Sequence, residues 1–143
     1  MSIVIREMTI QDYDEVFALW QASEGVGLSD ADSEKGVVCF LERNPGLSFV
    51  AHDGEYLVGA VICGHDGRRG YIHHLAVSKS HRRQGLGRAL VERCLSALGR
   101  EGIGKCHIFV FADNQDPIPF WKSIGWTERV ELIMMSQYTK GAV

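Results

Sequence analysis

The sequence lacks several features that would place it in a specialised class. No apolar run approaches the roughly 18 residues that a membrane-spanning helix needs. Proline accounts for only 3 of 143 residues, and the 4 cysteines form no Cys-x-x-Cys pair. These absences disfavour a membrane protein, a zinc site or other metal centre, and a disulfide scaffold. We therefore expect buried free thiols in a cytoplasmic protein.

The length and the apolar content predict one domain, which we place at residues 3–138. A chain of 143 residues with 45% hydrophobic composition can bury a full core. Charge interrupts the N-terminal apolar run at Arg6, so we expect no signal sequence or membrane anchor. The sequence does not distinguish an apolar face that packs in the core from one that packs against a second copy. A monomer and a homodimer therefore both remain as alternatives.

The net charge of −3 conceals two blocks of opposite sign. Residues 1–66 carry three Lys and Arg against twelve Asp and Glu, whereas residues 67–93 carry seven against Glu92 alone. The basic block favours a polyanionic ligand, although a solvated charged face is the simpler alternative. Nucleic acid is disfavoured because aromatic residues do not alternate with these cations.

Hydrophobic periodicity predicts a mixed α and β order. Strand Ile3–Arg6 precedes two short helices, the second within Asp30–Arg43. Turn residues at Asp53-Gly54 and at 66–70 then predict three antiparallel strands. The expected elements that follow are a helix over 85–98, a parallel strand over 105–111, a short helix near 117–124, and one or two closing strands over 128–138.

A glycine loop, Arg82-Arg83-Gln84-Gly85-Leu86-Gly87-Arg88, follows the apolar run Leu75-Ala76-Val77 and opens the predicted helix. Glycines let an anion approach the first-turn N–H groups, and the positive end of the helix dipole favours it. We therefore predict a pyrophosphate cradle here. A simple turn before a helix is the alternative.

The order of elements and three motifs resemble the GNAT acetyltransferase superfamily over about residues 3–137. The motifs are Leu75-Ala76-Val77, Arg82-x-x-Gly85-x-Gly87, and Asn114 followed by Phe120-Trp121-x-x-x-Gly125-Trp126. The resemblance implies an α+β fold with a central mixed, mostly antiparallel sheet of six to seven strands, splayed between strands four and five and flanked by about four helices. It also implies binding of acetyl-CoA through Leu75, Ala76, Val77, Arg82, Arg83, Gln84, Gly85, Leu86, Gly87, Arg88, Asn114 and Trp121.

Tyr138 and His73 are the two candidates for proton transfer, as acid and as base respectively. Trp121 stands where many relatives carry a tyrosine that protonates the CoA thiolate, and Tyr138 is a possible substitute. Neighbours on a regular strand point to opposite faces, so at most one of His73 and His74 should reach the acceptor cleft unless a bulge intervenes. We favour His73 as base or water-holder, because it shares its face with Tyr71 and imidazole titrates in the useful range. Packing is the alternative role for each, and Asn114 could instead cap the next helix.

The resemblance implies direct acetyl transfer from acetyl-CoA to a primary amine of a small molecule or a protein. The acidic first half of the chain favours a cationic acceptor. Two other functions stay open, namely a CoA-binding sensor without turnover and a protein whose glycine loop binds another phosphate. Sequence alone does not identify the acceptor.

Overall fold

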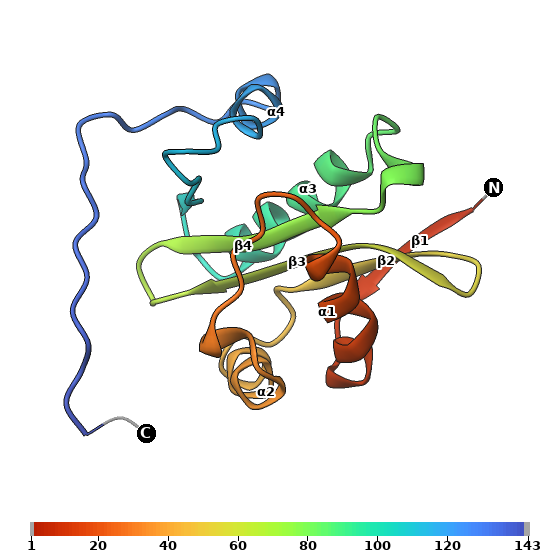
Figure 1. The fold of residues 1–143 in the computed structure, drawn as a ribbon, viewed down its shortest axis with the longest axis horizontal. Helices are drawn as coiled ribbons and strands as arrows, with labels where there is room; N and C mark the ends of the chain where they lie inside the picture. Colours follow the sequence, from red (N-terminus) through yellow and green to blue (C-terminus); the bar gives the residue numbers. More distant parts are fainter. Residues whose placement is uncertain (1, 142–143) are drawn as a thin grey trace.

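The computed structural model describes residues 2–141, in which a five-stranded mixed sheet lies between two layers of helices (Figure 1). The sheet has the order β1-β2-β3-β4-β5; successive strands from β1 to β4 are antiparallel, and β5 runs parallel to β4. The elements are β1 (Ile3–Glu7), α1 (Tyr13–Gln21), α2 (Glu34–Arg43), β2 (Phe49–Asp53), β3 (Tyr56–His65), β4 (Gly70–Val77), α3 (Leu86–Arg100), β5 (Cys106–His107) and α4 (Ile118–Ser123). Short 3-10 helices are η1 (Ile10–Asp12), η2 (Asp30–Asp32) and η3 (Lys79–His81).

The sheet carries one apolar cluster on each face, because successive side chains of a strand point to opposite sides. On β2, Phe49 and Ala51 belong to the cluster beneath α3, whereas Val50 belongs to the cluster beneath α1 and α2. Trp20 of α1 is fully buried in the second cluster. We call these the α3 cluster and the α1/α2 cluster. The predicted helical and antiparallel organisation is confirmed.

A β-bulge interrupts β4 at the two histidines. On β3 the pairing advances two residues from Ala60 to Ile62, whereas the partners on β4 are Ala76 and His73, three residues apart. The extra residue changes the side on which the strand presents its side chains. Ile72 consequently lies in the α3 cluster and Ala76 in the α1/α2 cluster, although residues four apart share a face in a regular strand.

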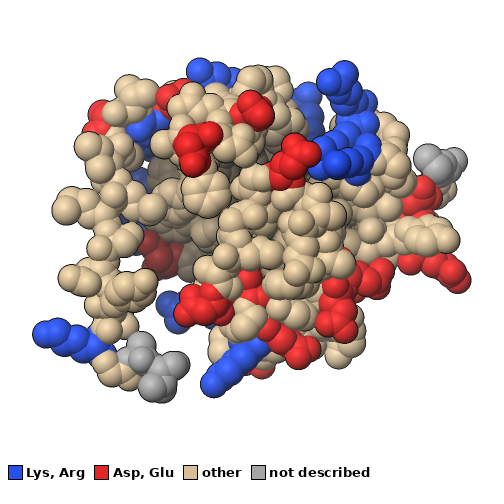
Figure 2. All heavy atoms as spheres, viewed as in Figure 1, with Lys and Arg blue, Asp and Glu red and all other residues tan. Residues whose placement is uncertain are grey.

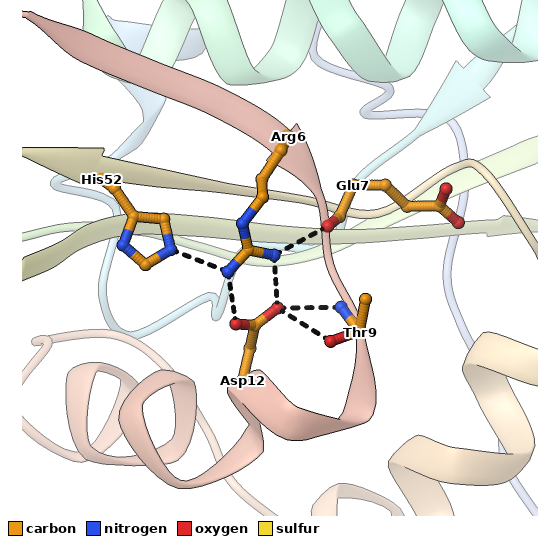
Figure 3. Close-up of polar contacts among 5 residues, drawn as sticks. All are labelled: Arg6, Glu7, Thr9, Asp12 and His52. Carbon is orange, nitrogen blue, oxygen red and sulfur yellow. Dashed lines mark hydrogen bonds and ion pairs between the residues drawn. The ribbon is translucent and has the colours of Figure 1, made fainter. Parts of the chain in front are cut away.

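An ion-pair network attaches the start of α1 to the sheet (Figure 3). The Arg6 guanidinium donates to both carboxylate oxygens of Asp12, at 2.8 and 2.7 Å, and to His52 Nε2 at 2.9 Å. Asp12 also accepts from the Thr9 N–H at 2.8 Å. Burial acts to raise the pKa of Asp12, but the bonds from Arg6 and Thr9 outweigh it and hold that pKa below its usual range.

The C-terminal segment, residues 127–141, departs from the prediction. Closing strands were expected over 128–138, but the segment contains no strand and runs apart from the helices and sheet (Figure 1). Its apolar residues are exposed, including Ile133 and Met135 at 90% and 92%. A strand needs a hydrogen-bonding partner, and the ladder beyond β4 stops at the two residues of β5. The sheet therefore has five strands instead of six or seven.

The cysteines only partly follow the expectation of buried thiols. All four are free; Cys63 and Cys94 are buried and Cys106 is half-buried, but Cys39 is exposed on α2. The neighbouring Cys63 thiol and burial raise the pKa of Cys106.

In residues 2–141, no helix is long and apolar enough to cross a membrane, and no three His, Cys, Asp or Glu side chains gather closely enough to hold a metal ion.

Candidate functional site

The glycine loop forms the N-terminal end of α3. Gly85 precedes the helix with φ of +79°, a left-handed conformation that suits glycine, and no side chain caps the helix end. Arg83 also has a positive φ of +61°. The first-turn N–H groups of a helix lack intrahelical partners, so they can bind an anion. The predicted cradle geometry is therefore present in the backbone.

Cations surround this helix end. Arg82 folds back so that its Nε donates to the Val77 carbonyl at 3.0 Å, and Arg88 Nε pairs with Glu92 at 3.1 Å on the exposed face of α3. Figure 2 shows Lys and Arg gathered at the upper right, where Figure 1 places the segment between β4 and α3. Asp and Glu spread over the lower half of the same face, where α1 and α2 lie. The two blocks of charge are only partly separated in space, because Glu24 of the acidic block lies 3.8 Å from Lys79 of the basic block.

Strand β4 has an open edge beside the glycine loop. It pairs with β5 only at Gly70 and Tyr71, whereas on its other edge it pairs with β3 as far as Val77. The strands therefore separate beyond Tyr71, as predicted for strands four and five. Leu75, Ala76 and Val77 lie along this unpaired edge, which offers backbone hydrogen-bonding groups to an extended ligand.

A second polar cluster fixes the approach to the loop. His81 Nε2 lies 2.8 Å from Asp53 Oδ2 at the end of β2, and its Nδ1 lies 2.9 Å from Ser78 Oγ. These contacts tie η3 to the β2–β3 hairpin. The segment that leads into the glycine loop is therefore positioned by side chains from the sheet.

The bulge in β4 brings both histidines to the face covered by α1 and α2. The His74 ring packs against Trp20 with centroids 5.0 Å apart, and the His73 ring packs against Phe40 of α2 at 6.0 Å. Their own centroids are 6.4 Å apart. The expectation that only one histidine would reach this face was conditional on a regular strand, and the bulge removes that condition.

The two histidines differ in their polar contacts. His74 Nε2 lies 2.8 Å from Asp32 Oδ1, and both side chains are largely buried. His73 makes no side-chain hydrogen bond to any residue in 2–141. Burial lowers the pKa of His73, and the nearby His74 lowers it further. His73 is therefore favoured in its neutral form.

Aromatic rings extend this face toward β5. Phe109, just after β5, stacks on Tyr71 with centroids 6.0 Å apart and on His73 at 6.5 Å. Phe109 is 59% exposed, so much of its ring is free to contact a ligand. We call Phe40, Tyr71, His73 and Phe109 the aromatic wall.

The segment between α1 and α2 crosses to the chain that follows β5. A Cβ added at Gly27 would lie 2.4 Å from the Phe111 ring, and one at Gly25 would lie 2.8 Å from Asn114 Nδ2. Any larger side chain at either position would have to displace these side chains, and Gly25 also has a positive φ of +81°, which favours glycine. Asn114 does not cap α4, because the residue at the cap position is Pro117. Asn114 thus lies where the helical layer meets the open side of the cleft.

Two further candidates lie outside this group. Trp121 is buried and packs against Phe120 and Trp126, with centroids 5.2 and 4.9 Å away, so its ring is part of the α3 cluster. Tyr138 is 95% exposed in the C-terminal segment. The structure does not bring Tyr138 together with the histidines, and the cofactor role of Trp121 stays a prediction.

Sequence reasoning missed Asp32. Its spacing from Ser29 is that of a helix-capping pair, and Asp32 indeed accepts from the Ser29 N–H at 3.0 Å. Its other oxygen contacts a histidine 42 residues away. The local signal indicated a cap, and no local signal indicated the contact with His74.

Comparisons with known proteins agree with this architecture. The model of the Acetyltransferase (GNAT) family matches residues 13–126. An acetyltransferase of Yersinia pseudotuberculosis is 30% identical over 133 residues, 93% of each chain. Among solved structures, Ard1 from Thermoplasma volcanium has a TM-score of 0.77 at 23% identity over 89% of this chain and 84% of its own. AAC(6')-Iy, bound to a CoA-S-monomethyl-acetylneamine bisubstrate analogue, has a TM-score of 0.76 at 16% identity over 97% and 100%. The chain belongs to the GNAT family of acetyltransferases.

Proposed function

We propose that this protein is an acetyl-CoA-dependent N-acetyltransferase that passes the acetyl group directly to a primary amine. The observation that carries the proposal is the uncapped N-terminus of α3 beside the open edge of β4. A pyrophosphate fits the first, and the extended pantetheine arm, which carries an amide chain, fits the second.

Acetyl-CoA supplies an activated thioester. The protein supplies position and polarity. Backbone N–H groups of alternate residues along 75–77 point to the open edge of β4, where the cofactor arm would lie. A fixed donor there would stabilise the oxyanion that develops as the amine attacks. Loss of one such donor typically costs about 2.7–4 kcal/mol in other enzymes.

The acceptor in this proposal is a cationic amine, carried by a small molecule or a polypeptide. The acidic surface over α1 and α2 favours a cation, and the aromatic wall offers apolar contact for the body that carries the amine. AAC(6')-Iy, which shares the fold, binds the bisubstrate analogue CoA-S-monomethyl-acetylneamine, and this supports a small molecule as one choice of acceptor.

Isothermal titration with acetyl-CoA and with ADP tests the cofactor assignment. We expect saturable binding of acetyl-CoA at least tenfold tighter than that of ADP, because only acetyl-CoA reaches the β4 edge. Thiol release is then measured with spermidine, kanamycin and an N-terminal peptide as acceptors. Binding without release from any acceptor indicates a CoA-binding sensor, and equal affinity for ADP indicates a nucleotide site.

A further inference from the structure

The contacts of His74 form a buried acid–base pair that the glycine-loop motifs do not include. Its Nε2 lies 2.8 Å from Asp32 Oδ1 on η2, whose other oxygen accepts from the Ser29 N–H at 3.0 Å. The Tyr13 hydroxyl donates to the Asp32 carbonyl at 2.7 Å. The carboxylate is therefore held between the His74 ring and the Ser29 N–H, and Tyr13 of α1 holds the backbone of the same residue.

The backbone of His74 is strained. Its φ is +52°, in the left-handed region that residues other than glycine rarely adopt. Such strain costs on the order of 1–3 kcal/mol and persists only where surrounding contacts enforce it. Here the bulge and the Asp32 contact enforce it, and together they turn the ring to the α1/α2 face beside the open end of β4.

The ring also packs against Trp20, whose indole nitrogen lacks a hydrogen-bond partner among the described residues. Trp20 Nε1 is buried and is the one buried side-chain nitrogen or oxygen in residues 2–141 without a hydrogen bond. The Trp20 and His74 rings meet edge to face at 5.0 Å. Unpaired buried N–H groups are rare in folded proteins, so their presence beside a strained, carboxylate-bound histidine is a second, independent sign of a functional site.

We propose that His74 is the general base for the acceptor amine and that Asp32 is its positioning residue, an inference that rests on the proposed N-acetyltransferase function. The Asp32 carboxylate accepts a hydrogen bond from Nε2–H. This bond fixes the tautomer in which Nδ1 carries the free lone pair. Nδ1 has no hydrogen-bond partner among residues 2–141. The pair repeats the base and orienter of a catalytic triad, with the amine in place of a serine.

The proton balance is as follows for a protonated primary amine. His74 Nδ1 takes one proton from the ammonium, and the Asp32 carboxylate stabilises the imidazolium. The freed nitrogen lone pair attacks the thioester carbonyl carbon to form the N–C bond. The C–S bond breaks with its electron pair on sulfur, the second proton of the attacking nitrogen passes to that thiolate, and His74 returns its proton to water.

His73 has a different part. It lacks a carboxylate partner, and its contacts are with the rings of Phe40, His74 and Phe109. The groups that face the His74 ring are Asp32 from η2, His73 from β4 and the uncharged Trp20 from α1. His73 therefore belongs to the aromatic wall, and the base is the histidine beside it.

Kinetics of His74→Asn and Asp32→Asn test the assignment, with thiol release measured for the best acceptor among spermidine, kanamycin and an N-terminal peptide. In His74→Asn, asparagine tolerates the positive φ of this position. In Asp32→Asn, the amide oxygen can still accept from the Ser29 N–H. We expect kcat/KM at pH 7 to fall about 100-fold or more for His74→Asn and about tenfold for Asp32→Asn.

The matched control is Glu101→Gln. His65 Nε2, at the end of β3, and Glu101 Oε1, just after α3, form a pair of the same 2.8 Å length. Neither residue belongs to the aromatic wall or to the glycine loop. The kcat/KM of Glu101→Gln should equal that of the wild type. Unchanged turnover in either His74→Asn or Asp32→Asn overturns the assignment.

A spectroscopic reading needs no acceptor. Long-range ¹⁵N–¹H spectra of the protein with acetyl-CoA should show the neutral His74 ring protonated at Nε2, and Asp32→Asn should weaken that preference. A ring protonated at Nδ1 overturns the inference and leaves the transferase intact. Absence of acetyl-CoA binding or of any turnover by the wild type overturns the proposed function, and the inference with it.

Discussion

The region that the proposal assigns to the cofactor is built from neighbouring stretches of chain, whereas the region assigned to the acceptor gathers residues from the first half of the chain, from β4 and from beyond β5. Residues 75–88 supply the open β4 edge, the glycine loop and the start of α3. His74, Asp32, Trp20 and Phe109 come from four separate elements or segments. Under the proposed function, the binding of acetyl-CoA would depend on local backbone shape, and the handling of the amine would depend on packing between layers.

Gly87→Glu should give the largest effect and confine it to the cofactor side. A carboxylate on the first turn of α3 repels phosphate and fills the approach to the N–H groups. We expect acetyl-CoA affinity to fall more than 100-fold by isothermal titration. The added Cβ would lie 3.3 Å from the Phe120 ring, so the melting temperature is recorded as well.

The control for this change is Gly99→Glu in the same helix, where an added Cβ meets no atom within 4 Å. It should bind acetyl-CoA as the wild type does. If Gly87→Glu binds with unchanged affinity, the α3 N-terminus is not the phosphate site.

Asp12→Asn should destabilise the acceptor side alone. It replaces the charged member of the Arg6–Asp12–His52 network at the start of α1, and we expect a loss of about 1–3 kcal/mol in the free energy of unfolding at pH 7. Because the pKa of Asp12 is lowered in the folded state, its stabilisation is full above the ordinary carboxyl pKa of about 3.9 and is lost as pH falls through the folded value.

Urea unfolding at pH 7 and pH 3 measures this difference. The gap between the wild type and Asp12→Asn should narrow at the lower pH, and acetyl-CoA affinity at pH 7 should stay within twofold. An equal gap at both pH values would show that the charge of Asp12 is not the source of the stabilisation.

Phe109→Ala should weaken the acceptor and spare the cofactor. Truncation removes the exposed ring of the aromatic wall, and we expect the KM for the amine to rise about tenfold, which corresponds to about 1.4 kcal/mol. Steady-state kinetics measure the effect on the KM for the amine, and isothermal titration measures the effect on acetyl-CoA affinity. Val4→Ala, an exposed apolar residue on β1 at the opposite sheet edge, is the control. A change confined to acetyl-CoA affinity would move Phe109 to the cofactor side.

Arg88→Ala should give the smallest effect. The side chain is exposed and shares its charge with Glu92, so we expect acetyl-CoA affinity to fall about threefold and the loss to shrink at high salt. Titration in 50 and 500 mM NaCl measures both. Arg100→Ala, in the last turn of α3, should have no effect; a loss there equal to that of Arg88→Ala would point to general charge attraction instead of a local contact.

The cofactor side could be predicted from sequence because its determinants are adjacent residues. Gly85 and Gly87 at the start of an amphipathic helix indicate a backbone that can bind phosphate. The structure places the start of α3 within one residue of the expected position. The splay after Tyr71 required the family resemblance, since nothing local in 70–77 signals where a ladder stops.

The acceptor side could not be predicted in the same way. Alternation along a strand gives the face of His73 and His74 only if the register is regular, and the extra residue is set by pairing with β3. The apolar alternation over 128–138 likewise favours an extended chain, but a strand also requires a partner, which the pattern does not supply.

The two apolar clusters let the protein open in parts. Each face of the sheet has its own set of buried residues, so α1 and α2 can loosen while the contacts of α3 persist. Amide hydrogen exchange should then show two cooperative units, with faster exchange in α1 and α2 than in α3. Under the proposed function, sequence changes in α1 and α2 would alter which amine is accepted while the binding of acetyl-CoA stays constant.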